Sequence, residues 1–311
     1  METDDPWARA LAMLTPDAVE EFRRHRNLRP AIGRVGLGAW TFVTSQDDFG
    51  FWISQHNRRI AIGMTLAVLD ARDMGATAGE LLRTCQQMLG ANRGGVAAFV
   101  DRAVASGDLA IESAGVAWGN RKLVVQPQFH QRLRDGIGGI LGGLGDLIPE
   151  LAGVIEALED PATLRSFLLT FGMISSFRPD LVAEGPIDQF TRRDRGLGFL
   201  HYFLRHQAPD PNRTQLLERV TLSRRRLARD MMVSRMHVAR LLEDGQDSGA
   251  FSMPSPDEIV FSPELSDRFE TRMAVGLQIV RATCVAARLD APVDHGRMAR
   301  LDRTVGSPAG G

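Results

Sequence analysis

The densest group of chemically active side chains in the sequence lies in residues 221–240. Six arginines stand there against a single acid, Asp230. The arginines are Arg224, Arg225, Arg226, Arg229, Arg235 and Arg240. A guanidinium group makes charge-assisted, often bidentate hydrogen bonds to phosphate groups and to the edge of guanine. The whole chain has a formal net charge of −1, which counts against nucleic-acid binding. A prediction of nucleic-acid binding therefore depends on the local excess of arginine.

Two serines indicate how these arginines are arranged. Ser223 is a suitable N-cap for a helix over 224–231, and Ser234 is a suitable N-cap for a second helix after a short turn. The first helix begins with Arg224, Arg225 and Arg226. Cations at a helix N-terminus oppose the helix dipole, and a bound phosphate would relieve that conflict. An ordinary charged surface is the alternative.

The second helix has an apolar face and a polar face. The apolar positions follow the helical spacing i, i+3, i+4 and i+7 and are Val238, Leu241, Leu242 and Gly245. The opposite face presents Arg235, Met236, His237, Ala239 and Arg240. A solvated basic helix face is the alternative to a base-reading surface.

The neighbouring segments extend this pair of helices. An apolar helix is expected over 199–206, and a further helix near 213–219. Gly249 ends the helix that Ser234 begins. Short strands at 250–253 and 258–261 then predict a β-hairpin, and a long helix follows Pro263. Helix, helix, tight turn, helix and hairpin is the order of a winged-helix domain.

The helix-turn-helix of bacterial winged-helix regulators closely resembles the run Leu227-Ala228-x-x-Met231-x-Val233-Ser234-Arg235-x-x-Val238-x-Arg240-Leu241-Leu242. The Crp/Fnr and MarR families have similar runs. Resemblance to Crp-type proteins implies that Arg235, Met236 and Arg240 are the base-reading positions. That family usually has glutamate where Met236 stands, and methionine cannot accept a hydrogen bond from cytosine. The base specificity of the family therefore does not carry over, although Met236 can contact a thymine methyl group.

Three blocks of the sequence recur in the same order, which predicts internal duplication. Ile53-x-Gln55-x-x-Arg58-Arg59 matches Ile187-x-Gln189-x-x-Arg192-Arg193. Asn92-Arg93-x-x-Val96-x-x-Phe99-Val100-Asp101 matches Ser234-Arg235-x-x-Val238-x-x-Leu241-Leu242-Glu243, and Leu123-Val124-Val125-x-Pro127 matches Ile259-Val260-Phe261-x-Pro263. The spacing is too long for a solenoid, so each copy is expected to be a domain with its own core.

The first copy lacks most of the reading face. Gly94, Gly95 and Ala98 stand where the second copy has Met236, His237 and Arg240, so that Asn92, as N-cap, and Arg93 are the polar residues that remain. A longer wing over 109–125 carries Trp118, Gly119, Asn120, Arg121 and Lys122 at or near its tip. We expect a weak base reader that uses Asn120, Arg121 and Lys122 for phosphate contact, or else an ordinary charged turn. The helix after Pro127 continues into the glycine-rich stretch 136–145, which indicates close helix packing.

The expected fold is mainly α-helical with small β-hairpins, built as two tandem winged-helix domains related by internal duplication. The domains span 49–158 and 186–289. An N-terminal helical segment at 1–48 precedes them, with Trp7, Leu11, Leu14 and Val19 as core positions. A helical linker at 159–185 joins them, and a disordered tail follows at 290–311.

No residue pattern points to catalysis, a metal or a cofactor. The seven histidines are scattered, neither GxSxG nor a Walker pattern occurs, and Cys85 and Cys284 stand apart inside apolar helical patterns. No apolar run is long enough for a membrane span, and the acidic residues 1–5 precede no signal core. A cytoplasmic protein that is not an enzyme is expected.

The predicted function is a transcription regulator that binds double-stranded DNA, with its two winged helices acting as an intramolecular pseudo-dimer. A homodimer through the helices after each wing is a further expectation. Two alternatives stay open. One is a replication initiator or chromosome-partition factor, and the other is a protein-interaction scaffold built on winged helices.

Overall fold

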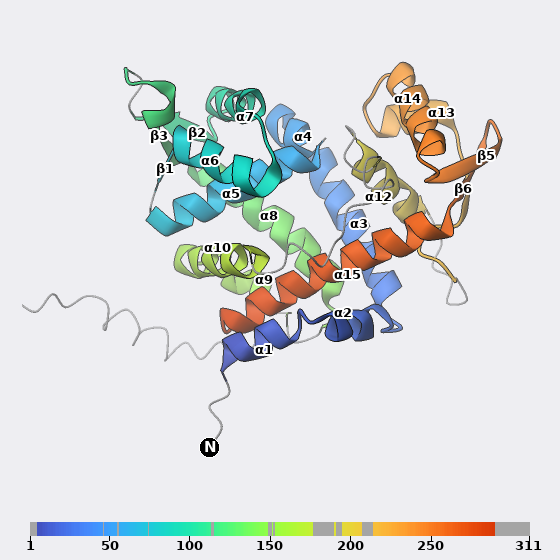
Figure 1. Cartoon of the computed structure of the whole chain (residues 1–311), viewed down its shortest axis with the longest axis horizontal. Helices are drawn as coiled ribbons and strands as arrows, with labels where there is room; N and C mark the ends of the chain where they lie inside the picture. Colours follow the sequence, from blue (N-terminus) through green and yellow to red (C-terminus); the bar gives the residue numbers. More distant parts are fainter. Residues whose placement is uncertain are drawn as a thin grey trace, which may run out of the picture.

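The computed structural model of the chain describes residues 5–45, 47–54, 56–73, 75–112, 115–148, 151, 153–176, 190, 195–206 and 214–289. The protein is mainly helical and contains two small three-stranded antiparallel sheets (Figure 1). The expected mainly α-helical fold with small hairpins is confirmed at this level.

The same order of elements occurs twice along the chain. The first unit contains α5 (Asn57–Asp73), β1 (Ala76–Thr77), α6 (Ala78–Leu89), α7 (Arg93–Ala105), β2 (Leu109–Ile111), the 3-10 turn η1 (Trp118–Asn120), β3 (Lys122–Val125) and α8 (Pro127–Leu144). The second unit contains α12 (Gly196–His206), β4 (Arg219–Thr221), α13 (Arg224–Asp230), α14 (Arg235–Asp247), β5 (Phe251–Ser255), β6 (Glu258–Phe261) and α15 (Pro263–Ala286). The strand order is β1-β3-β2 in one sheet and β4-β6-β5 in the other, so the third strand of each unit is central in both.

The turns before and after α7 and α14 have matching backbone conformations. Gly90 and Met232, each two residues before an N-cap, are left-handed with φ of 57° and 52°. Gly107 and Gly249, just after the two helices, have φ of 80° and 70°. A left-handed conformation costs a residue with a Cβ atom about 1–2 kcal/mol. Met232 nevertheless adopts it, so the tight turn is imposed by the packing of α13 on α14.

The apolar faces of the two helices are buried as their periodicity predicts. Val96 and Val238 occupy matching positions and have exposed fractions of 0% and 1%. Leu241, Leu242 and Gly245 are also buried.

The other helices of the described residues pack around the two units, and two of them contact both. These other helices are α1 (Pro6–Ala12), α2 (Pro16–Arg23), α3 (Leu28–Ser45), α4 (Asp48–Ser54), α9 (Val154–Ala157) and α10 (Pro161–Ser176). The helix α3 packs on α8 of the first unit and on α12 of the second, whereas α10 packs on α15 of the second unit and on α5 of the first. We call α3 and α10 the leading helices, because α3 precedes the first unit in the chain and α10 precedes the second. Each leading helix therefore contacts the first helix of the other unit. The helices α1 and α2 lie along α15 (Figure 1).

Glycines permit two of these contacts. A methyl group at Gly36 of α3 would lie 3.2 Å from His201 Nδ1 of α12, and one at Gly172 of α10 would lie 2.5 Å from Val68 Cγ1 of α5. Both positions are close approaches between a leading helix and the first helix of the other unit.

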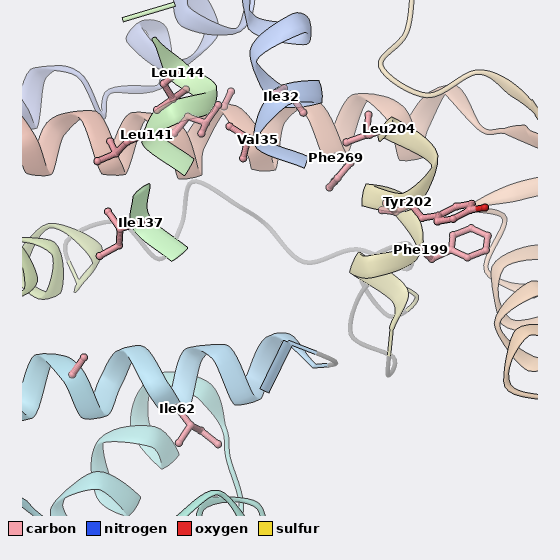
Figure 2. Packing of buried hydrophobic residues seen from close by; sticks show 14 of the residues in the cluster. Ile32, Val35, Ile62, Ile137, Leu141, Leu144, Phe199, Tyr202, Leu204 and Phe269 are labelled. Carbon is pink, nitrogen blue, oxygen red and sulfur yellow. The ribbon is translucent and has the colours of Figure 1, made fainter. Parts of the chain in front are cut away.

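The glycine-rich part of α8 packs against α3. A Cβ atom at Gly143 would lie 2.7 Å from the backbone nitrogen of Val35, and one at Gly38 would lie 2.8 Å from the carbonyl oxygen of Gly139. Figure 2 shows Val35 beside Leu141 and Leu144 of α8. Close helix packing is therefore confirmed at Gly139 and Gly143, whereas Gly142 in the same run has no atom within 4 Å of an added Cβ.

One hydrophobic cluster contains residues from all four expected segments before the tail, for example Leu28, Phe99, Phe167 and Phe269. The expectation of a separate core for each copy is therefore wrong, because α3 and α10 each join the two units. The segment boundaries themselves stay a prediction. Residues 177–185 of the expected linker and the tail at 290–311 lie outside the described residues.

Two local expectations are wrong. Leu11 is 40% exposed and Trp7 is only partly buried, whereas Leu14 and Val19 are buried as expected. No helix occurs over 214–219. Residues 214–217 form a bend in which the backbone N–H groups of Thr214 and Gln215 donate to the carboxylate of Glu218, and strand β4 then begins at Arg219 and pairs with β6.

Candidate nucleic-acid interface

The two predicted N-caps place the arginine-rich helices. The hydroxyl of Ser223 accepts a hydrogen bond from the backbone N–H of Arg226 at 3.3 Å and begins α13. The hydroxyl of Ser234 accepts one from the backbone N–H of His237 at 3.1 Å and begins α14. Both caps are confirmed.

The outer face of α14 is open to solvent. Arg235, Met236 and Arg240 are exposed, and His237 is half-buried. Met236 is 64% exposed, although an apolar side chain of this length is normally covered. The three residues that resemblance to Crp-type proteins assigns to base reading therefore lie together on one accessible face.

A hollow of about 610 Å³ connects this face to α13. Its lining contains the arginines Arg225, Arg226, Arg229 and Arg235, together with Ser223, Ala228 and Val233. Arg224 is exposed but is not part of the lining. Four guanidinium groups around one concavity form a strongly cationic site of the kind that binds phosphate.

Asp230 is the acid at the edge of this hollow. One carboxylate oxygen accepts a hydrogen bond from Arg229 Nε at 3.0 Å, and the other accepts bonds from Arg226 Nε at 3.4 Å and from the hydroxyl of Tyr202 at 3.3 Å. Burial alone would raise the pKa of Asp230. The hydrogen bond and charge of Arg229, helped by Arg226 and Tyr202, hold it below its ordinary value.

A second hollow, of about 530 Å³, lies on the other side of Arg226. Its lining comes from α12 and β4 and comprises Tyr202, Phe203, His206, residues 218–223 and Arg226. The two hollows share Ser223 and Arg226. Burial, together with the charges of Arg205 and Arg226, lowers the pKa of His206.

The corresponding helix of the first unit presents a sparse face. Asn92 caps α7 by accepting a hydrogen bond from the backbone N–H of Gly95 at 2.8 Å. Arg93, Gly94, Gly95 and Ala98 are all exposed. Gly94, Gly95 and Ala98 leave the first turns of this face nearly flat.

The wing of the first unit differs from the expectation. The turn η1 packs on α6 instead of projecting as a tip. The backbone N–H of Ala78 donates to the carbonyl of Arg121 at 2.9 Å. A Cβ atom at Gly79 would lie 2.7 Å from the carbonyl oxygen of Gly119, so the glycine at position 79 allows this docking.

Because η1 packs on α6, the residues predicted to contact phosphate have neighbours that the sequence did not indicate. Arg93 lies over the ring of Trp118, with its guanidinium carbon 5.5 Å from the ring centre. Asn120 is exposed, whereas the Nε atom of Arg121 is buried without a hydrogen-bond partner. Lys122 lies within β3, and its ammonium group is 2.9 Å from the carboxylate of Glu112. Of the three predicted phosphate contacts Asn120, Arg121 and Lys122, Asn120 is therefore the one that is exposed without an acidic partner such as Glu112.

Figure 1 shows α7 and α14 toward the same edge of the molecule, with the two sheets at its outer sides and with α1 and α2 at the opposite edge. The structure thus brings Arg225, Arg226 and Arg235 together, and it leaves the predicted residues of the first unit at a separate place.

Sequence reasoning gave no specific role to Arg229, Asp230, Tyr202 or Trp118. The solitary position of Asp230 in the basic segment 221–240 was a usable signal, since a lone acid among arginines is expected to pair. Its partner Tyr202 stands 28 residues away in the chain, and local patterns do not carry that contact.

Among the described residues, no group of three or more His, Cys, Asp or Glu side chains is arranged to hold a metal ion. Cys85 and Cys284 are buried and form no disulfide, and burial raises the pKa of Cys85 to about 11. Within the same parts of the chain, no helix has the length and apolar character to cross a membrane. No protein-family model, curated protein or solved structure matches the chain.

Proposed function

We propose that the chain is a double-stranded DNA-binding protein and that its role is transcription regulation. In this proposal the two units are winged-helix domains related by internal duplication, and they act as an intramolecular pseudo-dimer. The observation that carries the proposal is the hollow lined by four arginines beside the exposed face of α14. The shared element order, sheet order and left-handed turns support the duplication.

The geometry of the second unit fits a duplex. The major groove is about 12 Å wide and admits one α-helix. With the first turn of α14 in the groove, Arg235 and Met236 face base edges, and Arg240 follows one turn later. The arginine-lined hollow then receives a backbone phosphate at the edge of the groove, and Arg235 borders both surfaces.

The first unit contributes differently. Arg93 and Arg102 are the exposed cations of α7, and each lies over a tryptophan ring, Trp118 and Trp52 respectively. We expect the first unit to bind the DNA backbone mainly through Asn120, with smaller contributions from Arg121, whose Nε atom is buried, and from Lys122, whose charge Glu112 offsets. The pseudo-dimer then recognises an asymmetric site, with base specificity mainly in one half. A symmetric palindrome read equally by both units would contradict this.

The principal test is DNA binding by the intact protein at several salt concentrations, measured by fluorescence anisotropy with random and selected duplexes. Arg225→Ala removes a cation from the hollow and should weaken binding to both duplexes. The slope of log K against log salt should flatten by about 1. Arg26→Ala is the matched control, because Arg26 is an exposed arginine next to α2, at the opposite edge of the molecule. Equal effects of the two substitutions would refute a localised phosphate site.

Base reading is tested by binding-site selection. Arg235→Ala and Arg240→Ala should each relax sequence preference at one or two base pairs, because a bidentate arginine–guanine contact gives about 1–3 kcal/mol of discrimination. Arg93→Ala should change the selected sequence less. No selected sequence and no binding to random DNA would favour the protein-interaction scaffold instead.

The regulatory role is tested by mapping bound sites in the genome. Sites beside promoters support transcription regulation, whereas one cluster of repeated sites at an origin supports the replication alternative. The homodimer expected through α8 and α15 also stays a prediction. Both helices already pack within the chain, and size-exclusion chromatography with light scattering distinguishes a monomer from a dimer.

A further inference from the structure

Asp230 stands where it would be unfavourable unless it has a specific task. It is the single acid in residues 221–240, and it lies beside a hollow that four arginines line. A carboxylate near a phosphate-binding surface repels the phosphate. The side chain is nevertheless only partly exposed, at 16%, and holds three hydrogen-bond donors.

The atoms used in these contacts are informative. Arg226 and Arg229 each donate to Asp230 through Nε. Each guanidinium group carries further N–H donors on its two Nη atoms, which these two bonds do not use. The side chains of Arg226 and Arg229 are 58% and 75% exposed. Without an anchor, such long side chains would have to be ordered when a ligand binds, at a cost of up to about 2 kcal/mol each.

The anchor is itself fixed. The hydroxyl of Tyr202 donates to the oxygen of Asp230 that also receives Arg226. Tyr202 is buried on α12, with 5% of its surface exposed. The buried hydroxyl of Tyr202 therefore fixes the orientation of the Asp230 carboxylate, and the carboxylate fixes the orientation of Arg226 and Arg229.

We propose that Asp230 is a positioning residue that fixes Arg226 and Arg229 by their Nε atoms, so that their terminal nitrogens converge on one phosphate of the DNA backbone. Tyr202 is the second member of this device. The inference rests on the proposed function and deepens it, since it names the group that organises the phosphate site.

Positioning and simple charge predict opposite signs for one substitution. Asp230→Asn removes a negative charge, which by itself should strengthen DNA binding. Loss of positioning should weaken DNA binding, because it removes one phosphate contact. One contact adds about 0.9 to the slope of log K against log salt, so it contributes about eightfold in affinity at 0.1 M salt relative to 1 M salt. We expect Asp230→Asn to raise Kd several-fold for random duplex and to flatten the slope by about 1.

Glu243→Gln is the matched control. Glu243 is exposed on α14, and the substitution removes the same charge without touching the hollow. It should leave Kd unchanged or lower it. Tyr202→Phe keeps every charge and should weaken binding in the same direction as Asp230→Asn but less. If Asp230→Asn strengthens binding as Glu243→Gln does, or leaves the slope unchanged, the inference is overturned.

A readout without DNA separates this inference from the proposed function. The Nε–H signals of Arg226 and Arg229 in the NMR spectrum should be protected from exchange in the wild-type protein, and Asp230→Asn should abolish that protection. Pyrophosphate added at constant ionic strength should shift both signals in the wild-type protein only. Pyrophosphate binding without DNA binding would retain the phosphate site and refute the DNA function. Unprotected signals in the wild-type protein would overturn the positioning role.

Discussion

Two neighbouring glycines of α8 provide a sharp test of how the units are joined. At Gly143 an added Cβ atom would lie 2.6 Å from Val35 Cγ2, 2.7 Å from the backbone nitrogen of Val35 and 3.0 Å from its Cα atom. At Gly142 no atom lies within 4 Å of the added group. The substitutions Gly142→Ala and Gly143→Ala are therefore chemically identical and differ only in what the methyl group meets.

The expected magnitudes follow from this difference. Alanine is favoured over glycine inside a helix by up to about 1 kcal/mol, and both variants gain this term. Gly142→Ala should raise the free energy of unfolding by about 0.5–1 kcal/mol. Gly143→Ala also forces α8 away from the main chain of α3, and overpacking of this kind costs about 1–3 kcal/mol. Its net effect should be a loss of about 1–2 kcal/mol.

Thermal and urea unfolding followed by circular dichroism measures both effects. A change of 1 kcal/mol shifts Tm by about 2–4 °C for a domain of this size class. Gly142→Ala should therefore melt about 3–12 °C above Gly143→Ala. The added substitution Val35→Ala should restore only part of the loss in Gly143→Ala, because the clash with the backbone nitrogen persists. Equal melting temperatures for the two glycine variants would refute the close contact between α3 and α8.

Two further predictions concern His201 and the exchange of the leading helices, by which α3 and α10 each pack on the first helix of the other unit. Burial lowers the pKa of His201 to about 4, so below pH 6.5 the unfolded chain takes up a proton that the folded chain refuses. Stability is then complete above pH 6.5 and falls toward pH 4, by about 2 kcal/mol between pH 7.5 and pH 5. Urea unfolding should show this loss of stability, and His201→Leu should remove most of it. A smaller loss of the same sign should remain from His206, because burial also lowers its pKa. An unchanged pH dependence in the variant would contradict the assignment to His201. Because α3 and α10 each pack on the other unit, segments 1–159 and 160–311 expressed together as separate chains should form a 1:1 complex on size exclusion, and a stable folded monomer of 160–311 alone would refute the exchange.

The elements that sequence reasoning predicted well are those that local rules determine. Ser223, Asn92 and Ser234 each have a side-chain oxygen that caps a helix, and each helix begins where that residue type predicts. The apolar spacing around Val96 and Val238 gave the correct buried faces. Capping and periodicity act within four residues, so the sequence alone contains this information.

The features that were missed depend on contacts between distant residues. Strands β1 and β4 contain only two and three residues, too few for an alternating pattern, and they exist because β3 and β6 offer paired edges. The exchange of α3 and α10 gave no local signal either. Gly36 and Gly172 mark it in the structure, but a single glycine in an apolar helix has many explanations.

The site divides along the same line. The arginine-rich first turn of α13 and the exposed face of α14 were predictable from residue types and caps. The docked wing was not, because Gly79 lets α6 and η1 pack together across about forty residues of chain. That docking places Trp118 beneath Arg93, whereas Arg235 borders the arginine-lined hollow.

The contrast between Arg93 and Arg235 bears on how the two proposed domains divide their work. Both arginines follow an N-cap directly and begin a thirteen-residue helix. The backbone around them is alike, so any functional difference comes from what surrounds each guanidinium group. Arg93 has an aromatic ring as its neighbour, which holds the cation at the protein surface with about 0.5–1 kcal/mol. Arg235 has three other arginines around the same hollow, whose mutual repulsion an arriving phosphate relieves. Under the proposed function, we therefore expect a duplex that approaches both helices to gain more from the second unit, which would set the register of the DNA.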